Sequence, residues 1–385
     1  MLQQIGYRVR VNAPRLLAGL WIAAVIVASA QAAAHHANNF EIFRTSWDNL
    51  VAGHDLYAPS PRHRDVFLYS PTFALLFAPF AIVPFWLGVL LWNGVNAGAL
   101  YWGLGRILSR EQALAARAIV FLDTVGNMQN VQSNALVAGL MIIGCAELER
   151  RRELRAALAV ALGTAIKIFP IVAAAFSVFR PARLPRFAAS SAIVAAVLVG
   201  APLLFISPID LWGQYHSWMA VQGADEGGYS VMEHLRIWFG VGWANWPVQI
   251  AGVGILLAPL VRMSHWAQPR FRLLFLASVL MFSVLFNHGA ESPSFVIALA
   301  GVAIWFAVSE RDRFAWGVLT IVVIGTVLSS SDAMPTGLRR EIFQHYRLKT
   351  LPILLVWALT QVQLWRRSES APHQASAADR AAPAT

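Results

Sequence analysis

The residues best suited to chemistry lie in polar stretches that separate long apolar runs. The first such stretch, residues 35–68, carries both carboxylates and cations, including Glu41, Arg44, Arg64 and Asp65. A positioned carboxylate accepts the proton of a hydroxyl group, and a fixed cation stabilises negative charge that develops on a leaving group. Most of the other ionisable side chains in this stretch are typical of a solvated surface.

Three further ionisable residues lie close to or within apolar segments. Lys167 lies in an otherwise apolar run, one helical turn before Pro170. It is either a lysine whose ammonium group reaches the membrane interface or a fixed cation for a lipid phosphate. His288 and Glu291 occupy a tight connection between two strongly apolar segments, where polar groups are costly and usually functional. All three are therefore candidate substrate-binding residues.

The elements that must position these residues are membrane helices. Of the 385 residues, 57% are hydrophobic and 13% are charged, whereas soluble domains carry about 25% charged residues. The sequence predicts an all-α polytopic membrane protein with about ten to twelve transmembrane or re-entrant helices. We expect one integral membrane domain over residues 1–366, followed by a disordered tail at 367–385. The single cysteine, Cys145, excludes a disulfide framework.

The net charge of +10 indicates membrane topology rather than nucleic-acid binding. Arginines cluster in short gaps between apolar runs, as in cytoplasmic loops, and no basic domain stands apart from the apolar segments. The expected partner is therefore the lipid bilayer, with no nucleic acid. We predict a multi-pass protein of the bacterial inner (plasma) membrane with cytoplasmic N- and C-termini.

The apolar segments do not all alternate simply across a membrane. The segments lie near residues 14–34, 69–82, 84–105, 113–125, 131–147, 156–179, 187–206, 247–262, 273–287, 293–309, 314–329 and 351–365. The first is either a signal peptide or a retained span, and its length favours the span. Parity of the crossings predicts that 69–82 is re-entrant and that 156–179 is a hairpin bent at residues 166–170. Loops 35–68, 207–246, 287–293 and 330–350 then lie outside.

The first outer stretch also has helical periodicity. Apolar residues recur at three- and four-residue spacing, namely Phe40, Phe43, Trp47, Leu50 and Val51. This pattern predicts a short amphipathic helix on the outer membrane interface, which ends at Gly53. Nucleotide-binding signatures are absent from the sequence, and the Asp and Glu residues lack a recognisable metal-ligand spacing. We therefore expect no cofactor and no metal.

Several motifs, taken in order, resemble glycosyltransferase family 87. The motifs are residues 53–57 (Gly-His-Asp-Leu-Tyr), 69–80 (Tyr-Ser-Pro-Thr-Phe-Ala-Leu-Leu-Phe-Ala-Pro-Phe), 91–93 (Leu-Trp-Asn) with Asn96, 129–130 (Gln-Asn) with Asn134, and 165–170 (Ala-Ile-Lys-Ile-Phe-Pro). The resemblance covers about residues 14–310. It implies a GT-C-type, mannosyltransferase-like enzyme. Such enzymes move a hexose, often mannose, from a polyprenyl-phosphate carrier to a lipid-linked or glycan acceptor outside the membrane, with inversion and without a metal.

The resemblance also implies a catalytic base, and here the chain departs from the family. The mannosyltransferases of the family use an Asp near the start of the first outer loop, and that position corresponds to Asn39. An amide cannot serve as the base, so Asp65 or Glu41 is the candidate replacement. The substrate-binding candidates are Asn39, Arg44, Arg64, Tyr69, Gln129, Lys167, His288 and Glu291.

Two other functions are compatible with these patterns. The loss of the expected Asp would suit a non-catalytic polyprenyl-lipid-binding protein or a flippase with a GT-C-like fold. A solute transporter would carry ionisable residues at mid-membrane on several segments. Apart from Lys167 and Asp123, the apolar segments contain few such residues.

Overall fold

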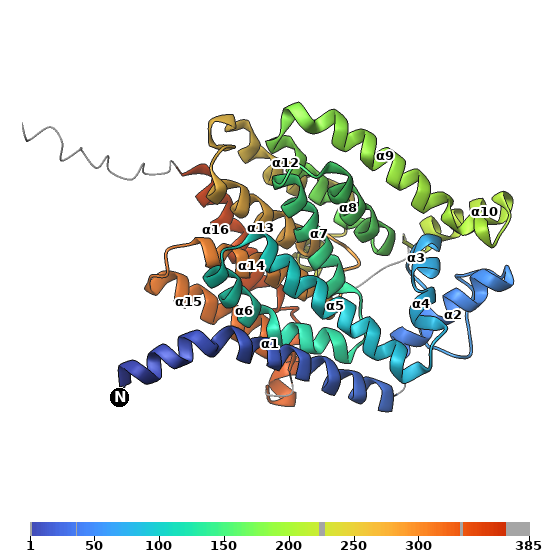
Figure 1. Ribbon diagram of the computed structural model, residues 1–385, viewed down its shortest axis with the longest axis horizontal. Coiled ribbons are helices and arrows are strands. Elements are labelled where there is room, and N and C mark those ends of the chain that lie inside the picture. Colours follow the sequence, from blue (N-terminus) through green and yellow to red (C-terminus); the bar gives the residue numbers. More distant parts are fainter. Residues whose placement is uncertain (1, 36, 223–227, 332–333, 367–385) are drawn as a thin grey trace, which may run out of the picture.

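The computed structural model describes residues 2–35, 37–222, 228–331 and 334–366, with side chains from residue 12 onward. Every regular element in these ranges is a helix, which confirms the all-α class (Figure 1). The predicted disordered tail at 367–385 lies outside the described residues, as do the side chains of Arg8 and Arg10.

The long helices follow the predicted apolar segments closely. They are α1 (Leu2–Ala34), α5 (Phe85–Ile107), α6 (Arg110–Gln129), α7 (Asn134–Glu149), α8 (Glu153–Ile166), α9 (Leu184–Gly200), α12 (Asn245–Leu257), α13 (Pro269–Leu285), α14 (Phe295–Val308), α15 (Arg313–Val322) and α16 (Thr350–Trp365). Within the described ranges, Asn12–Ala34 and Pro181–Leu204 are long and apolar enough to cross a membrane, and the other apolar helices are shorter. The number of crossings therefore stays a prediction.

The centre of the bundle is formed by α5, α7, α13 and α14. Nearly every side chain of α14 is buried, and α14 packs along most of α13. Helix α5 packs closely on α7 at Gly139, where a Cβ atom would lie 2.5 Å from the backbone carbon of Ala99. Small residues allow this approach between backbones, which gives dispersion contacts to helices that gain little from the hydrophobic effect in lipid.

Helix α1 packs against this centre as a retained span would. It contacts both α5 and α6, and Trp21, Ala28 and Ser29 are buried in the contact. The Asn93 side chain donates a hydrogen bond to the Ser29 hydroxyl at 3.1 Å. This hydrogen bond joins α1 to α5 inside the bundle. Retention of α1 as a span stays a prediction.

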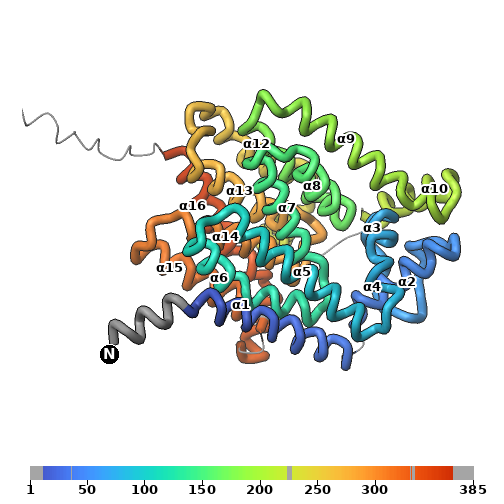
Figure 2. The backbone as a smooth tube through the Cα atoms, viewed as in Figure 1, coloured from blue at the N-terminus to red at the C-terminus, as the bar shows by residue number. Residues whose placement is uncertain are grey.

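Segment 69–82, which is predicted to be re-entrant, is interrupted in the structure, and its re-entrant course stays a prediction. This segment forms two short helices, α3 (Pro71–Leu76) and α4 (Ala78–Ala81), which meet at Phe77. The Ser70 hydroxyl caps α3 by accepting the Phe73 N–H, and Pro79 lies in the first turn of α4. Both helices pack against α2 (Asn38–Ala52), and α3 also contacts α10 (Pro208–Gln222), at one end of the molecule (Figure 2).

The predicted hairpin at 156–179 is confirmed. Helix α8 ends at Ile166, and Lys167 has extended backbone dihedrals of −139° and 142°. The chain then returns as a 3₁₀ helix, η1 (Phe169–Phe179), which packs back on α8. Lys167 therefore lies at the tip of the hairpin rather than in the middle of a span.

The amphipathic helix is present, but its surroundings differ from the prediction. Helix α2 (Asn38–Ala52) ends at Gly53, which adopts the left-handed conformation with φ 69°. Its apolar face packs on protein instead of lipid, because Phe40 and Phe43 make ring contacts with Phe77 at 5.2 Å each. An edge-to-face aromatic cluster adds to simple area burial, so α2 is a fixed part of the fold.

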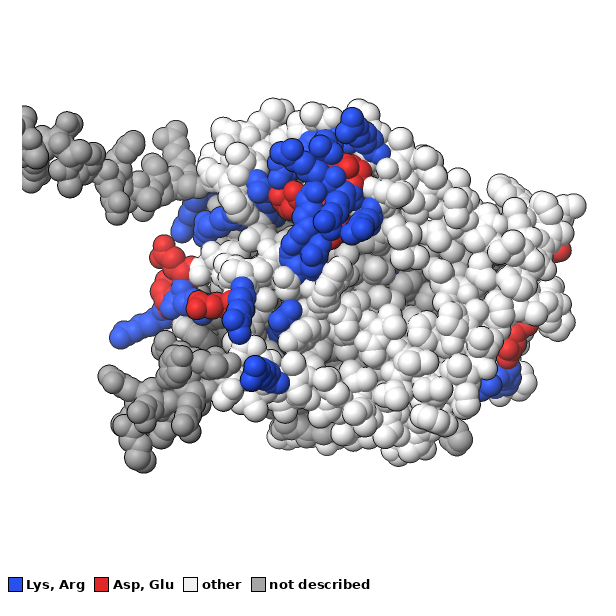
Figure 3. Space-filling model, in the orientation of Figure 1, with Lys and Arg blue, Asp and Glu red and all other residues white. Residues whose placement is uncertain are grey.

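Charged residues gather at the opposite end of the bundle. Figure 3 shows a dense cluster of arginines over the loops that join α7 to α8 and η1 to α9. Several arginines there pair with glutamates, as in Arg106–Glu147 at 2.6 Å and Arg183–Glu153 at 2.8 Å. Most of the remaining visible surface is uncharged, which is the distribution that a membrane-embedded bundle requires.

The α5–α7 contact generates a stability prediction. Gly139→Ala places a methyl group against the Ala99 backbone, so we expect the free energy of unfolding to fall by about 1–3 kcal/mol. Thermal unfolding in detergent measures the change. Gly98→Ala on α5 is the matched control, because nothing lies within 4 Å of its added Cβ atom. Equal melting temperatures for the two variants would contradict the proposed packing.

Candidate functional site

Two cavities adjoin each other at the end of the bundle that carries α2 and α3. The inner cavity has a volume of about 340 Å³, and its polar lining consists of Asn39, Asp65, Tyr69, Gln132, Lys167, Gln222, Gln249, Ser283, Asn287, His288 and Glu291. The outer cavity has a volume of about 1130 Å³, and its polar lining consists of Gln31, His35, Asn38, Asn39, Glu41, Arg62, His63, Arg64, Asp65, Gln129 and Asn130. Asn39 and Asp65 line both cavities, so they form the boundary between them.

Most of the predicted site residues come together at these cavities. Six of them line the inner cavity, namely Asn39, Asp65, Tyr69, Lys167, His288 and Glu291. Three others line the outer cavity, namely Glu41, Arg64 and Gln129. Arg44 lies half-buried on α2 and lines neither cavity.

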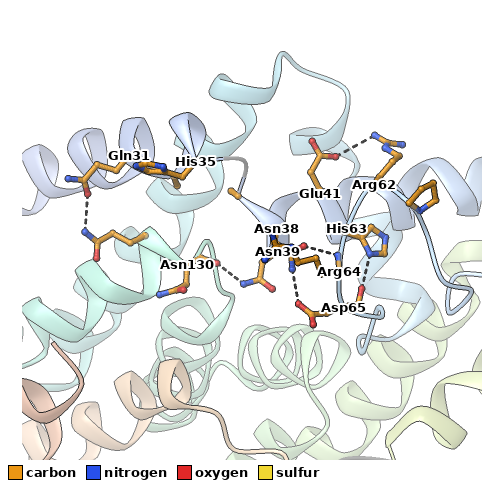
Figure 4. Close-up of a pocket in the computed structure, with 14 residues that line it drawn as sticks. Gln31, His35, Asn38, Asn39, Glu41, Arg62, His63, Arg64, Asp65 and Asn130 are labelled. Atoms are coloured by element: carbon orange, nitrogen blue, oxygen red, sulfur yellow. Dashed lines mark hydrogen bonds and ion pairs between the residues drawn. The ribbon is translucent and has the colours of Figure 1, made fainter. Parts of the chain in front are cut away.

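Asp65 is held by the first turn of α2. Its Oδ2 atom accepts a hydrogen bond from the Asn38 side-chain Nδ2 at 2.8 Å (Figure 4). The Asn38 side-chain Oδ1 accepts the Arg64 backbone N–H at 3.0 Å. The His63 ring nitrogen lies 2.7 Å from the backbone oxygen of Asp65. No hydrogen bond from the described residues engages Oδ1. This arrangement orients the carboxylate and leaves one oxygen open for a ligand.

The side-chain amide of Asn39 has a structural role. Its Nδ2 donates to the Asn130 carbonyl oxygen at 2.7 Å, which ties α2 to the turn between α6 and α7 (Figure 4). A carboxylate at this position has no proton to donate and would face a carbonyl oxygen. The local hydrogen bonding therefore favours an amide over a carboxylate at this position.

Tyr69 forms the wall beside Lys167. Its ring stacks on Phe73 at 4.7 Å and meets Phe43 edge-on at 4.9 Å. The Tyr69 hydroxyl donates to the Gln132 side-chain oxygen at 3.5 Å. The Lys167 Nζ atom lies 5.8 Å from the ring centroid, within the range of a cation–π contact.

The tip of the α8–η1 hairpin is fixed from the neighbouring α3 helix. The Ser70 hydroxyl donates a hydrogen bond to the Ala165 backbone oxygen, two residues before Lys167. The same Ser70 side chain caps α3. One side chain therefore joins the two motifs that are far apart in the sequence, and it sets the position of the lysine backbone.

His288 and Glu291 lie in a constrained loop between α13 and α14. The His288 Nε2 atom lies 3.1 Å from the Gln222 backbone oxygen, and Glu291 Oε2 accepts from the Gln132 side chain at 3.4 Å. Gly228 passes directly over this loop, because a Cβ atom there would lie 2.5 Å from the His288 oxygen. The loop thus presents both side chains to the inner cavity from a fixed backbone.

Sequence reasoning missed several lining residues. Gln132 follows the Gln129-Asn130 motif by two residues, so its proximity was a usable signal. Trp218 and Gln222 on α10 and Gln249 on α12 carried no such signal, since they reach the cavity from helices far along the chain. Among the described residues, no group of three or more His, Cys, Asp or Glu side chains is arranged to hold a metal ion. Independence from metals stays a prediction.

A buried ion pair holds the loop that carries Glu291 in place. The Lys349 Nζ atom donates to the Ser292 backbone oxygen at 3.1 Å and to its hydroxyl at 3.0 Å. It also lies 3.8 Å from Asp123 of α6, and the two side chains are 5% and 10% exposed. A buried charge without its partner is costly, so each of these residues depends on the other.

Lys349→Met should therefore lower the free energy of unfolding by about 3–5 kcal/mol, because it leaves the Asp123 carboxylate buried alone. The double variant Lys349→Met, Asp123→Leu should recover most of this loss. Thermal and denaturant unfolding of the four proteins in the cycle measure both effects. Equal stability of the single and double variants would show that the pair is not coupled.

The comparison with known proteins identifies the family. The family model for glycosyltransferase family 87 matches residues 67–287, which is more than half of the chain. The matched region runs from α3 to α13 and includes Tyr69, Gln132 and Lys167, whereas Asp65 and Glu291 lie just beyond its two ends. No curated protein matches the chain. The predicted family is thus confirmed, and the chain belongs to glycosyltransferase family 87, as a membrane glycosyltransferase.

Proposed function

We propose that this protein transfers a hexose from a polyprenyl-phosphate carrier to a lipid-linked or glycan acceptor on the extracytoplasmic face of the bacterial inner membrane. The observation that carries this proposal is the joint placement of Asp65 and Lys167 in one cavity. Sugar transfer from a phosphate carrier needs a base for the acceptor and a cation for the leaving group. The cavity offers both.

The reaction proceeds by a single displacement at the anomeric carbon. The acceptor oxygen forms a new bond to this carbon as the bond to the carrier phosphate oxygen breaks, which inverts the configuration. Asp65 accepts the proton of the acceptor hydroxyl. The released polyprenyl phosphate gains negative charge, and the Lys167 ammonium stabilises that charge, so no divalent metal is required in this scheme.

Asp65 suits the role of base better than Glu41. Asp65 lines both cavities and has one carboxylate oxygen that the described residues leave without a hydrogen bond. Glu41 lines the outer cavity alone and forms an ion pair with Arg62 at 3.5 Å. The Arg62 guanidinium therefore already engages the Glu41 carboxylate.

The charge distribution supports the assignment of sides. The arginine cluster marks the cytoplasmic end by the positive-inside tendency, and the cavities lie at the end that carries α2 and α3. A carrier lipid would then present its phosphate to Lys167 from the outer leaflet. His288, Glu291 and Tyr69 would position the sugar or the phosphate.

The base assignment predicts the effect of Asp65→Asn. We expect kcat to fall by about 10²–10⁴-fold, because an amide cannot accept the proton. The purified protein is supplied with radiolabelled polyprenyl-phosphate mannose or glucose and with a bacterial membrane extract as the source of acceptors. Glu41→Gln is the matched control and should retain most of the activity.

Full turnover in Asp65→Asn would overturn the base assignment. Donor binding without transfer by the wild-type protein, across a range of sugar donors, would instead favour a non-catalytic lipid-binding protein or a flippase. Proteoliposome uptake driven by an ion gradient would favour a solute transporter.

The role of Lys167 predicts a difference between two substitutions. Lys167→Met should lower kcat by about 10–100-fold, because the departing phosphate loses its cation, whereas Lys167→Arg should keep most of the rate. Addition of EDTA should leave the wild-type rate unchanged, and NMR of the product should show the inverted anomer. Equal rates for the Met and Arg variants would contradict the assignment.

A further inference from the structure

Helices α1 and α5, which lie side by side (Figure 1), enclose an apolar groove on the outside of the bundle. Its volume is about 370 Å³, and its lining includes Ile22, Val25 and Ile26 of α1 and Gly94, Gly98 and Tyr101 of α5. None of the described residues that line it is charged. Nothing lies within 4 Å of a Cβ atom added at Gly94 or Gly98, so the groove is open over both glycines. A hydrocarbon chain contacts such a surface readily.

A guanidinium group lies at one end of this groove. The Arg117 Cζ atom of α6 lies 3.7 Å from the centroid of the Tyr101 ring, and Arg117 Nε donates to the Tyr101 backbone oxygen at 2.9 Å. A Cβ atom at Gly105, one helical turn after Tyr101, would collide with Arg117 Nη2. The guanidinium therefore lies over α5 just beyond the groove, close to the point where α5 ends at Ile107.

Arg117 has no acidic partner in the part of the chain that the structure describes. The neighbouring Arg106 differs, because it pairs with Glu147 at 2.6 Å. The described residues also place no hydrogen-bond acceptor against Nη1 or Nη2 of Arg117, whose hydrogen bond to Tyr101 uses Nε alone. A half-buried cation in a membrane protein usually has a partner, so these donors point to an anion from outside the chain.

The level of Arg117 along the bundle matches that of lipid headgroups. Trp102 follows Tyr101 on α5 and is exposed, and tryptophan near the end of a membrane helix favours the headgroup layer. The Arg106–Glu147 pair follows Gly105 directly and belongs to the arginine-rich end of the bundle (Figure 3). A phospholipid with a chain in the groove would hold its phosphate at this level.

We propose that the groove and Arg117 together bind an anionic phospholipid, with an acyl chain between α1 and α5 and the headgroup phosphate on Nη1 and Nη2 of Arg117. A guanidinium group matches the geometry of a phosphate with two parallel hydrogen bonds. A zwitterionic headgroup brings its own cation, whereas an anionic one leaves its negative charge for the arginine. Basic pockets between membrane helices are a general mode of binding for lipids of this charge.

This site is independent of the sugar-transfer reaction. No described residue that lines the groove also lines the inner or the outer cavity. Binding of the phospholipid therefore stands or falls separately from the proposed function.

Native mass spectrometry of the full chain in detergent tests the proposal, because it counts bound lipids by mass. The protein is titrated with dioleoyl phosphatidylglycerol, which is anionic, and separately with dioleoyl phosphatidylcholine, which has the same chains. We expect the anionic lipid to bind about tenfold more tightly, and Arg117→Gln to abolish this preference, since the charged hydrogen bonds are lost. The matched control is Arg155→Gln, which removes an exposed arginine of α8 and should leave the preference unchanged.

Gly98→Leu tests the groove without touching the arginine. A leucine side chain has room there, because nothing lies within 4 Å of its Cβ atom, so the variant should fold. It occupies the groove, and we expect both lipids to bind more weakly. Glycerol 3-phosphate, which has the phosphate but no acyl chain, should fail to compete with phosphatidylglycerol at equal concentration.

Four results would overturn the proposal. They are equal affinities of the wild-type protein for the two lipids, a preference that survives Arg117→Gln, an equal loss in Arg155→Gln, and binding that Gly98→Leu leaves unchanged. Effective competition by glycerol 3-phosphate would likewise show that the acyl chain is not held. If Arg117→Gln fails to fold, Gly98→Leu and the competition experiment decide the outcome.

Discussion

Two adjacent amides at the start of α2 hold the candidate site together. Asn38 donates to the Asp65 carboxylate, and Asn39 donates to the backbone of the α6–α7 turn. These bonds connect three segments that are separated by up to 91 residues in the sequence. They also fix the boundary between the two cavities, because Asn39 and Asp65 line both of them. The other candidate site residues lie on one side or the other of this boundary.

The interrupted segments α3–α4 and α8–η1 also help to build the candidate site. Backbone polar groups within a bilayer must be satisfied internally, so irregular structure there is tolerated only where protein or a water-filled cavity surrounds it. The chain meets this condition at the α3–α4 break and at the α8–η1 turn. Ser70 donates to the Ala165 carbonyl near the turn and caps the start of α3. The turn at the end of α8 thereby places Lys167 in the lining of the inner cavity. A long unbroken helix would have carried Lys167 past this cavity.

The departure at Asn39 illustrates how far residue identity alone can mislead. Compared with the family pattern, the missing Asp suggests a lost base. In the fold, the same amide is a hydrogen-bond donor to Asn130, and a carboxylate from the next loop, Asp65, stands at the cavity boundary. Glu41 looked equivalent to Asp65 in the sequence. The ion pair with Arg62 and the position in the outer cavity alone now separate the two.

The sequence by itself determined the helical class, the membrane family and the turn at residues 166–170, and nine of the ten residues that it singled out line the two cavities. Hydrophobic periodicity, arginine placement and short motifs are local properties, so they can be read directly from the sequence. Only the tertiary structure decided that α2 packs on an aromatic cluster instead of lipid, that Arg44 lines neither cavity, and that Trp218 and Gln222 line the inner one. Each of these depends on which distant surfaces meet, and such pairings arise from packing between helices rather than from the spacing of residues within one.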